Sequence, residues 1–167
     1  MGLLALQRWS FYKQPTFDID EASLERRYKL LQWTLHPDKA VSRTAEEQDF
    51  SAGHASQINQ AYGVLRRSLS RANYLLMLAG VPAGDHFEGT LEDPELLMEV
   101  MEARERVEGT SDPSELRELL AANRSDQRRV EGQLSAAFGA GDTARAAALV
   151  AQLTYYVRLE EAIVAKL

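Results

Sequence analysis

The residues best suited to proton chemistry are His36 and Asp38, which flank Pro37. A histidine and a carboxylate this close in sequence could act as a general acid and base. The sequence places no nucleophile, glycine-rich phosphate loop or carboxylate constellation beside them. A loop tip also excludes water poorly, which disfavours a closed catalytic site. The tripeptide therefore favours docking over catalysis, and we expect no catalytic residue and no enzyme activity.

Two predicted helices must position this tripeptide. Pro37 should end the upstream helix at about His36, because proline cannot continue a helix and restricts the preceding residue. The core face of this helix would comprise Leu24, Tyr28, Leu31 and Leu35. Thr44 and Glu47 form a capping box that can start the downstream helix. That helix can bury Phe50, His54, Ile58, Ala61, Leu65 and Leu69.

These two helices predict an antiparallel hairpin that presents His36, Pro37 and Asp38 at an exposed tip. The alternative is that the tripeptide has only a local structural role, with His36 as a helix cap, Pro37 as a helix stop and Asp38 as a turn residue. The flanking helices and the basic residues of the first helix favour the docking interpretation over the local one.

Composition excludes several classes of function. The chain has 167 residues, 45% of them hydrophobic, which is enough for one ordinary domain or two small ones. It contains no cysteine, so disulfides, thiolate nucleophiles and cysteine zinc sites are excluded. The three histidines are spread along the chain, so we expect no metal site and no cofactor. No apolar stretch approaches the roughly twenty residues of a membrane span, so no membrane contact is expected.

Charge divides the chain into unlike halves. Residues 1–80 carry 10 Lys and Arg against 8 Asp and Glu, a net charge of +2. Residues 81–167 carry 9 against 17, a net charge of −8, and the two add to the stated −6. Nucleic-acid binding usually requires a concentrated basic face, so this distribution argues against it. Two regions with different partners fit the asymmetry better.

The turn signals divide the chain at residues 79–92. We therefore predict a first domain at 1–78, a linker at 79–92 and a second domain at 93–167. Three helix starts are visible in the second domain, at Asp93-Pro94, at Asp112-Pro113 and at Asp142. No strand signal competes, so the second domain is predicted to be an antiparallel three-helix bundle and the whole chain all-α.

The helix that begins near Asp93 has two apolar faces. At about 100° per residue, a core stripe is formed by Leu96, Val100, Ala103 and Val107. A second face, centred roughly 130° away, contains Leu97, Met98, Met101, Arg104 and Glu105, with Glu102 at its border. Large apolar side chains with a polar rim are typical of a partner-binding surface, and methionine adapts well to partners. Burial of this face by other helices is the alternative.

The last helix contributes one further aromatic residue. Its core stripe is predicted to comprise Leu149, Val150, Leu153, Tyr156, Val157 and Val164. Tyr155 points roughly 160° to 200° away from Leu153. We expect it to lie outside the core, where it could extend the Leu97, Met98 and Met101 surface.

The hairpin resembles a J-domain, the module by which co-chaperones stimulate the ATPase of DnaK-type chaperones. The resemblance is carried by Arg26, Arg27, Lys29, His36, Pro37, Asp38 and Lys39. It implies that these seven residues bind the chaperone. The cations would steer the domain to an acidic surface, and His36 and Asp38 would act by docking rather than by proton transfer.

Over about residues 10 to 167, the chain resembles the HscB family of iron-sulfur cluster co-chaperones. The segments that carry this resemblance are Leu69–Leu76, Leu97–Glu105 and Thr154-Tyr155-Tyr156. It implies a DnaK/HscA-type chaperone and an IscU-type iron-sulfur cluster scaffold protein as partners. Positions matching the scaffold contacts are Leu97, Met98, Met101, Glu102, Arg104, Glu105 and Tyr155.

The resemblance implies a non-enzymatic adaptor that delivers the scaffold protein to the chaperone and stimulates ATP hydrolysis there. Two alternatives stay open: a general J-protein with a different client, and a helical assembly scaffold without chaperone coupling. Lys13-Gln14-Pro15 and Trp33 depart from the family pattern. Likeness to eukaryotic, plant-type members favours the mitochondrial matrix, as a mature form, or the cytosol over the bacterial cytoplasm.

Overall fold

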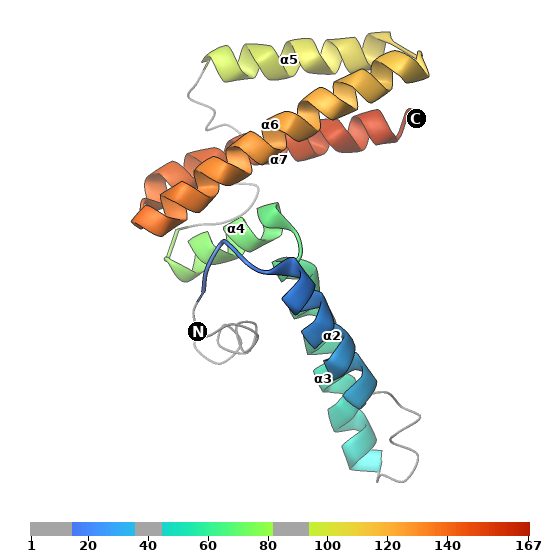
Figure 1. The fold of residues 1–167 in the computed structure, drawn as a ribbon, viewed down its shortest axis with the longest axis vertical. Helices are drawn as coiled ribbons and strands as arrows, with labels where there is room; N and C mark the ends of the chain where they lie inside the picture. Colours follow the sequence, from blue (N-terminus) through green and yellow to red (C-terminus); the bar gives the residue numbers. More distant parts are fainter. Residues whose placement is uncertain (1–14, 36–44, 82–93) are drawn as a thin grey trace. The chain divides into compact units, whose positions relative to one another are not determined.

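The computed structural model describes residues 15–35, 45–81 and 94–167, and the regular structure of these residues consists of helices (Figure 1). Within these ranges there is no strand, so the prediction of an all-α protein is confirmed. The chain divides into two compact units, residues 1–71 and residues 72–167. This division falls seven residues before the end of the predicted first domain at 78. The limits of that domain and of the linker at 79–92 stay predictions.

The first unit is built around a helical hairpin. Helices α2 (Glu21–Leu35) and α3 (Ala45–Leu65) run antiparallel beside each other (Figure 1). Asp20 precedes α2, and its carboxylate accepts hydrogen bonds from Ser23 N at 3.0 Å and Ser23 Oγ at 2.7 Å. These bonds satisfy one of the amide groups that a helix leaves unpaired at its start. Helix α3 begins at Ala45, close to the predicted start. The capping box itself stays a prediction, because Thr44 and the side chain of Glu47 lie outside the described residues.

The inner face of the hairpin combines apolar burial with an aromatic stack. Leu24 and Leu65 are fully buried, and Ala61 nearly so. The rings of Tyr28 and Tyr62 lie parallel, with centroids 4.0 Å apart. The predicted burial of Leu24, Ala61 and Leu65 is confirmed, whereas the part played by Tyr62 was not predicted. The side chains of Leu35 and Phe50 lie outside the described residues.

The helix predicted downstream of the His36-Pro37-Asp38 tripeptide does not continue to Leu69. It ends at Leu65, and a separate helix α4 (Ser68–Leu78) follows a turn at residues 66 and 67. Arg71 explains the corner in part, because its buried guanidinium donates a hydrogen bond to Leu65 O and lies over the Phe17 ring at 5.0 Å. This side chain satisfies a carbonyl that the ending helix α3 cannot pair within itself. The hydrophobic spacing alone did not reveal this turn.

The second unit contains the predicted three-helix bundle, formed by α5 (Pro94–Gly109), α6 (Pro113–Ala140) and α7 (Thr143–Val164). Asp112 and Asp142 cap α6 and α7, accepting from Ser114 N at 3.0 Å and Arg145 N at 2.9 Å. Gly141 ends α6 in the left-handed conformation, at φ 70°, which glycine adopts without steric cost. The two predicted starts at Asp112 and Asp142 are confirmed, while Asp93 lies outside the described residues.

Side chains at seven-residue spacing form the seam between α6 and α7. They are Leu116, Asn123, Val130 and Ala137 on α6, and Leu149, Tyr156 and Ile163 on α7. The prediction that Val164 belongs to the core is wrong, because Val164 is 51% exposed and the adjacent Ile163 is fully buried. An ideal helix drifts about 20° per heptad relative to a seven-residue repeat. Counting 100° per residue therefore selected the wrong neighbour at the end of α7.

Candidate partner-binding surfaces

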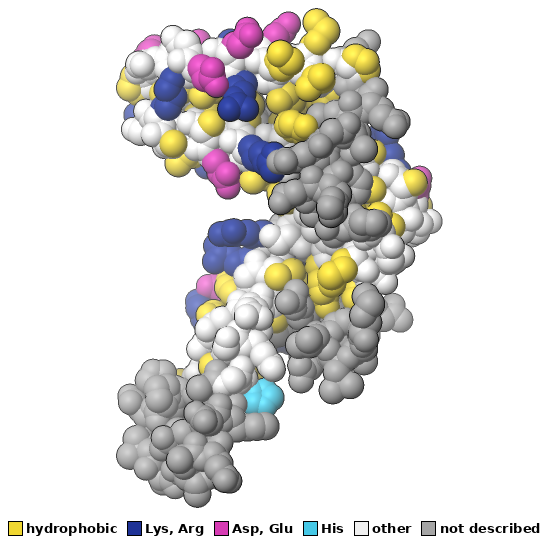
Figure 2. Space-filling model, turned by 180° about the vertical axis from the view of Figure 1, so that it is seen from behind, with side chains coloured by type: hydrophobic (Ala, Val, Ile, Leu, Met, Phe, Trp, Pro, Cys, Tyr) yellow, Lys and Arg dark blue, Asp and Glu magenta, His cyan; other side chains and the backbone are white. Residues whose placement is uncertain are grey.

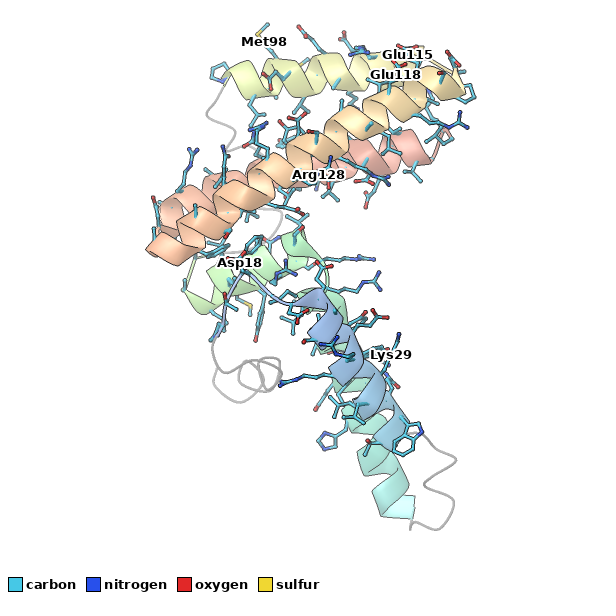
Figure 3. All side chains as sticks on the ribbon, in the orientation of Figure 1. Asp18, Lys29, Met98, Glu115, Glu118 and Arg128 are labelled. Carbon is cyan, nitrogen blue, oxygen red and sulfur yellow. The ribbon has the colours of Figure 1, made fainter. Side chains whose placement is uncertain are left out.

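The outer face of α5 carries exposed apolar residues. Leu97, Met98 and Met101 are 41%, 62% and 54% exposed, whereas Leu96 and Val107 on the inner face are buried. Figure 3 shows Met98 pointing away from α6 and α7, and Figure 2 shows hydrophobic side chains gathered over the beginning of α5. We call Leu97, Met98 and Met101 the α5 patch. The predicted division of this helix into two faces is confirmed.

Charged groups border the α5 patch. Glu102, Arg104 and Glu105 are all exposed, as predicted. Arg104 Nε lies 3.1 Å from Glu108 Oε1, one helical turn further along the same helix. Such an exposed pair contributes little to stability, so Arg104 can exchange its partner at low cost. The border therefore offers both signs of charge to a partner.

Tyr155 is partly buried on α7 rather than stranded outside the bundle. A helix in a three-helix bundle has neighbours on two sides, so a residue opposite one contact is covered in part by another. Its neighbour Tyr156 is buried, as predicted. The contribution of Tyr155 to the α5 patch stays a prediction.

The solvent-facing side of α2 combines cations with apolar residues. Arg26, Arg27 and Lys29 are exposed, and Figure 3 shows Lys29 extending from α2. Trp33 is 63% exposed, and Leu30 is 62% exposed. Sequence reasoning missed Leu30, although its i, i+3 spacing to Trp33 and i, i+4 spacing to Arg26 place all three on one face.

Two of these cations, Arg26 and Lys29, lie close to acidic side chains of the same helix start. Lys29 Nζ lies 2.7 Å from Glu25 Oε1, and this hydrogen bond, followed by the charge attraction, raises the pKa of Lys29 and lowers that of Glu25. Arg26 Nη2 donates to Ser23 Oγ at 2.7 Å and lies 4.0 Å from Asp20. The α2 face is therefore less cationic than its three basic residues alone indicate.

The remaining predicted chaperone-binding residues lie between α2 and α3. His36, Pro37, Asp38 and Lys39 lie outside the described residues. The hairpin that leads to them is described on both sides, by α2 up to Leu35 and by α3 from Ala45. Their role in binding stays a prediction.

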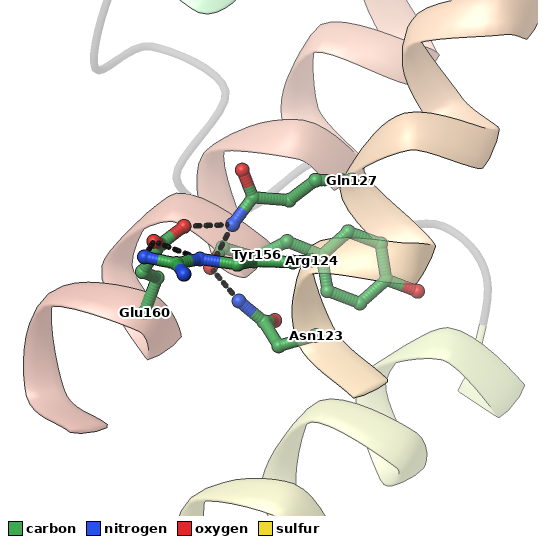
Figure 4. Close-up of polar contacts among 5 residues, drawn as sticks. All are labelled: Asn123, Arg124, Gln127, Tyr156 and Glu160. Atoms are coloured by element: carbon green, nitrogen blue, oxygen red, sulfur yellow. Dashed lines mark hydrogen bonds and ion pairs between the residues drawn. The ribbon is translucent and has the colours of Figure 1, made fainter. Parts of the chain in front are cut away.

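A polar cluster that the sequence did not reveal joins α6 to α7 (Figure 4). Asn123 Nδ2 donates to Tyr156 O at 2.9 Å, and Gln127 Nε2 donates to Glu160 Oε2 at 2.6 Å. Arg124 Nη2 pairs with Glu160 Oε1 at 2.8 Å. A polar residue in an otherwise apolar seam fixes the register of two helices, so this cluster positions α7 against α6. The seven-residue spacing of Asn123 with Leu116 and Val130 was the available signal.

Among the described residues, no group of three or more His, Asp or Glu side chains is placed to hold a metal ion. No helix in the described part of the chain combines the length and apolar character needed to cross a membrane.

Comparison with known proteins shows which family this chain resembles. The family model described as the HSCB C-terminal oligomerisation domain matches residues 92–164. The iron-sulfur cluster co-chaperone protein HscB of Mus musculus is 32% identical over 89% of this chain and 63% of its own length. The co-chaperone protein HscB homolog of Burkholderia mallei (strain SAVP1) is 34% identical over 94% of this chain and 91% of that protein. The crystal structure of human HscB matches with a TM-score of 0.85 at 30% identity, covering 95% of this chain and 81% of that one.

The crystal structure of a human co-chaperone thus shares the all-α architecture of this chain. The chain belongs to the HscB family of iron-sulfur cluster co-chaperones. It spans a little under two thirds of the length of the mouse relative. Identities of 32% to a mouse protein and 34% to a bacterial one do not separate the eukaryotic from the bacterial branch.

Proposed function

We propose that this protein brings an iron-sulfur cluster scaffold protein to a DnaK/HscA-type chaperone and stimulates the chaperone's ATPase. The observation that carries this proposal is the exposed α5 patch on a chain of the HscB family. The first unit would bind the chaperone and the second the scaffold. A tethered client reaches the chaperone at raised effective concentration, which strengthens the ternary complex without any new contact.

The scaffold would dock on the α5 patch through apolar contacts. Leu97, Met98 and Met101 would form the centre of that interface, and Glu102, Arg104 and Glu105 its polar rim. Tyr155 would add aromatic contact area at one edge. Because the centre is uncharged, the affinity should change little with ionic strength.

The chaperone would contact Arg26, Arg27 and Lys29, together with His36, Pro37, Asp38 and Lys39 between the two helices. The cations would steer association with an acidic surface, and the tripeptide would favour the hydrolysis-competent conformation of the chaperone. The pairing of Lys29 with Glu25 reduces this steering. Exposed Leu30 and Trp33 would supply part of the contact area on the same face.

The decisive experiment titrates an IscU-type scaffold protein into this protein by isothermal calorimetry. The triple variant Leu97→Ala/Met101→Ala/Tyr155→Ala should lose binding. A matched control, Met77→Ala/Leu78→Ala, removes exposed apolar area from α4 and should bind as the wild type does. Helicity and thermal unfolding of each variant separate lost contacts from lost folding. No binding by the wild type would contradict the scaffold half of the proposal.

A second experiment measures the chaperone's ATP hydrolysis in the presence of wild-type protein and of His36→Gln. Stimulation should be lost in the variant, while scaffold binding stays unchanged. Raising the salt from about 0.1 M to about 1 M shortens the Debye length from about 10 Å to about 3 Å and should weaken chaperone binding severalfold. Full stimulation by His36→Gln would contradict the chaperone half.

The alternative function is a general J-domain co-chaperone that serves a different client. Such a protein would show the His36 effect but no preference for a cluster scaffold. The likeness to the mouse relative is compatible with a mitochondrial location. We therefore propose the mitochondrial matrix, with the cytosol as the alternative, and detection of the tagged protein in fractionated cells distinguishes the two.

A further inference from the structure

The solvent-facing side of α2 carries two large apolar side chains, Leu30 and Trp33, which we call the α2 pair. They are 62% and 63% exposed, and among the described large apolar side chains only Met98 on α5 matches them. At about 100° per residue, the two lie roughly 60° apart around the helix. The inner side of α2, marked by buried Leu24 and by the stacked Tyr28, lies roughly 170° from the centre of the pair. The α2 pair is therefore outside the core of the hairpin.

Cations flank the α2 pair on both sides of the helix. Arg27 lies roughly 90° from the centre of the pair in one direction, and Lys29 lies roughly 70° from it in the other. Arg26 lies one helical turn before Leu30 on the same face. All three cations are exposed. An apolar centre with a charged rim is the composition of a surface that binds another protein.

The charge around the α2 pair is too balanced to attract a partner strongly by itself. Residues 18–35 contain three basic against four acidic side chains, a net charge of −1. Lys29 Nζ lies 2.7 Å from Glu25 Oε1, and Arg26 Nη2 lies 4.0 Å from Asp20 Oδ2. Long-range attraction to an acidic surface is therefore small, and close contacts must supply most of the affinity of this face.

We propose that the α2 pair is the anchor by which this protein binds its chaperone, and that the chaperone receives Trp33 in an apolar depression bordered by carboxylates. The inference rests on the proposed function and assigns the main source of affinity in its chaperone half. The pair is continuous with the proposed chaperone-binding residues, because Trp33 follows Lys29 by four residues and precedes His36 by three. Tryptophan often dominates binding energy, since it buries a large area while losing only two side-chain torsions.

The charged rim favours a chaperone over other occupants of this face. A two-fold contact with a second copy would bring Arg26 and Arg27 of one chain towards the same cations of the other. An anionic membrane attracts a segment through its summed charge, and that charge is −1 for residues 18–35. A protein surface can instead place individual carboxylates opposite individual cations around an apolar depression.

The first test measures binding of a DnaK/HscA-type chaperone with ATP to the immobilised full chain by biolayer interferometry. Leu30→Ala/Trp33→Ala should weaken binding about thirtyfold, the loss typical of an interface anchor. The matched control Met77→Ala/Leu78→Ala removes two exposed apolar side chains from α4 and should bind as the wild type does. Circular dichroism and thermal unfolding establish that each variant is folded. Equal affinity of the wild type and of folded Leu30→Ala/Trp33→Ala would overturn the proposal.

Substitution of Trp33 alone separates apolar anchoring from charge attraction. Trp33→Lys adds a cation, so it would tighten binding if an acidic chaperone surface recognised charge alone, whereas an apolar anchor requires at least a tenfold loss. Trp33→Phe keeps an aromatic ring and should retain most of the affinity. The loss caused by Leu30→Ala/Trp33→Ala should be the same at about 0.1 M and about 1 M salt, because apolar burial is not screened. Tighter binding by Trp33→Lys would refute the apolar anchor.

The His36→Gln measurement separates failure of this inference from failure of the proposed function. If the wild type binds the chaperone, His36→Gln abolishes stimulation and Leu30→Ala/Trp33→Ala binds normally, only the anchor is refuted. No chaperone binding by the wild type refutes both. With chaperone affinity unchanged in the double variant, loss of binding to vesicles of phosphatidylcholine and phosphatidylglycerol would assign the α2 pair to a membrane instead. Loss of a dimer in sedimentation would assign it to a second copy.

Discussion

The contacts inside the first unit of this protein differ from the contacts inside the second. In the first, buried Leu24 and Leu65 are supplemented by directional contacts, such as the Tyr28–Tyr62 stack. In the second, burial continues along the seam of seven-residue repeats on α6 and α7, and Leu134 and Leu153 on the same helices are also fully buried. Within the described residues, buried apolar side chains thus extend along the whole bundle, whereas in the hairpin they include Leu24, Ala61 and Leu65.

This difference matters for the surfaces that the two units present. The bundle can expose Leu97, Met98 and Met101 on α5 because its core is formed by other residues. The hairpin presents its cations on α2, whose described inner face includes Leu24 and Tyr28. We therefore expect changes to the α5 patch to alter binding with little effect on folding, whereas changes near the hairpin core alter both.

The prediction with the largest expected effect on stability concerns the seam between α6 and α7. Ile163→Ala should lower the free energy of unfolding by about 2 to 5 kcal/mol, because it removes buried methyl groups from a cluster with Val107, Leu116 and Leu119. Val164→Ala, one residue further along and half exposed, should cost less than about 0.5 kcal/mol. Urea unfolding followed by circular dichroism measures both. Equal losses would mean that the core follows 100° spacing rather than the heptad.

The next effect tests the directional contacts of the hairpin unit. Arg71→Ala should cost about 2 to 3 kcal/mol, because it removes a buried charged hydrogen bond to Leu65 O and the contact with the Phe17 ring. Hydrogen exchange of the last amides of α3 should accelerate. Arg71→Lys keeps the charge but not the planar fork and should be intermediate. A loss spread evenly over both units would contradict a local role for this side chain.

A smaller effect tests one directional contact within the bundle. Lys166 Nζ donates to Val107 O at 2.6 Å, Glu108 O at 3.0 Å and Thr110 O at 2.8 Å, at the end of α5. Lys166→Ala should lower stability by about 1 kcal/mol, because it removes a cation from carbonyls at a helix C-terminus. Faster hydrogen exchange confined to the last turn of α5 would support this role. Lys166→Arg should retain most of the effect.

The smallest effect is the pH dependence of the α2 start. The Ser23 hydroxyl, and then the Ser23 backbone amide, hold the pKa of Asp20 below its usual value of 3.8. A carboxylate with a depressed folded-state pKa stabilises the fold above its unfolded pKa, and this stabilisation is lost as the pH falls through the folded pKa. An NMR titration should therefore show Asp20 titrating below 3.8, with loosening of the first turn of α2 in the same range. Asp20→Asn should keep the cap and abolish the pH dependence.

Local sequence signals determined most of the helices. Proline after an aspartate started α6, and Asp142 after two glycines started α7, because caps and backbone restrictions act within a few residues. The outward direction of Leu97, Met98 and Met101 followed from helical spacing alone. These features require no knowledge of the partners that each helix meets.

Only the tertiary structure decided the remaining points. The guanidinium of Arg71 explains in part why α3 ends at Leu65, six residues earlier. The burial of Ile163 instead of Val164 reflects the packing of α7 against α6. A pocket lined in part by Asn123 forms where α5, α6 and α7 do not fill the space between them. Each of these depends on groups brought together by folding, and helical periodicity within one segment carries no information about the shape of its neighbours.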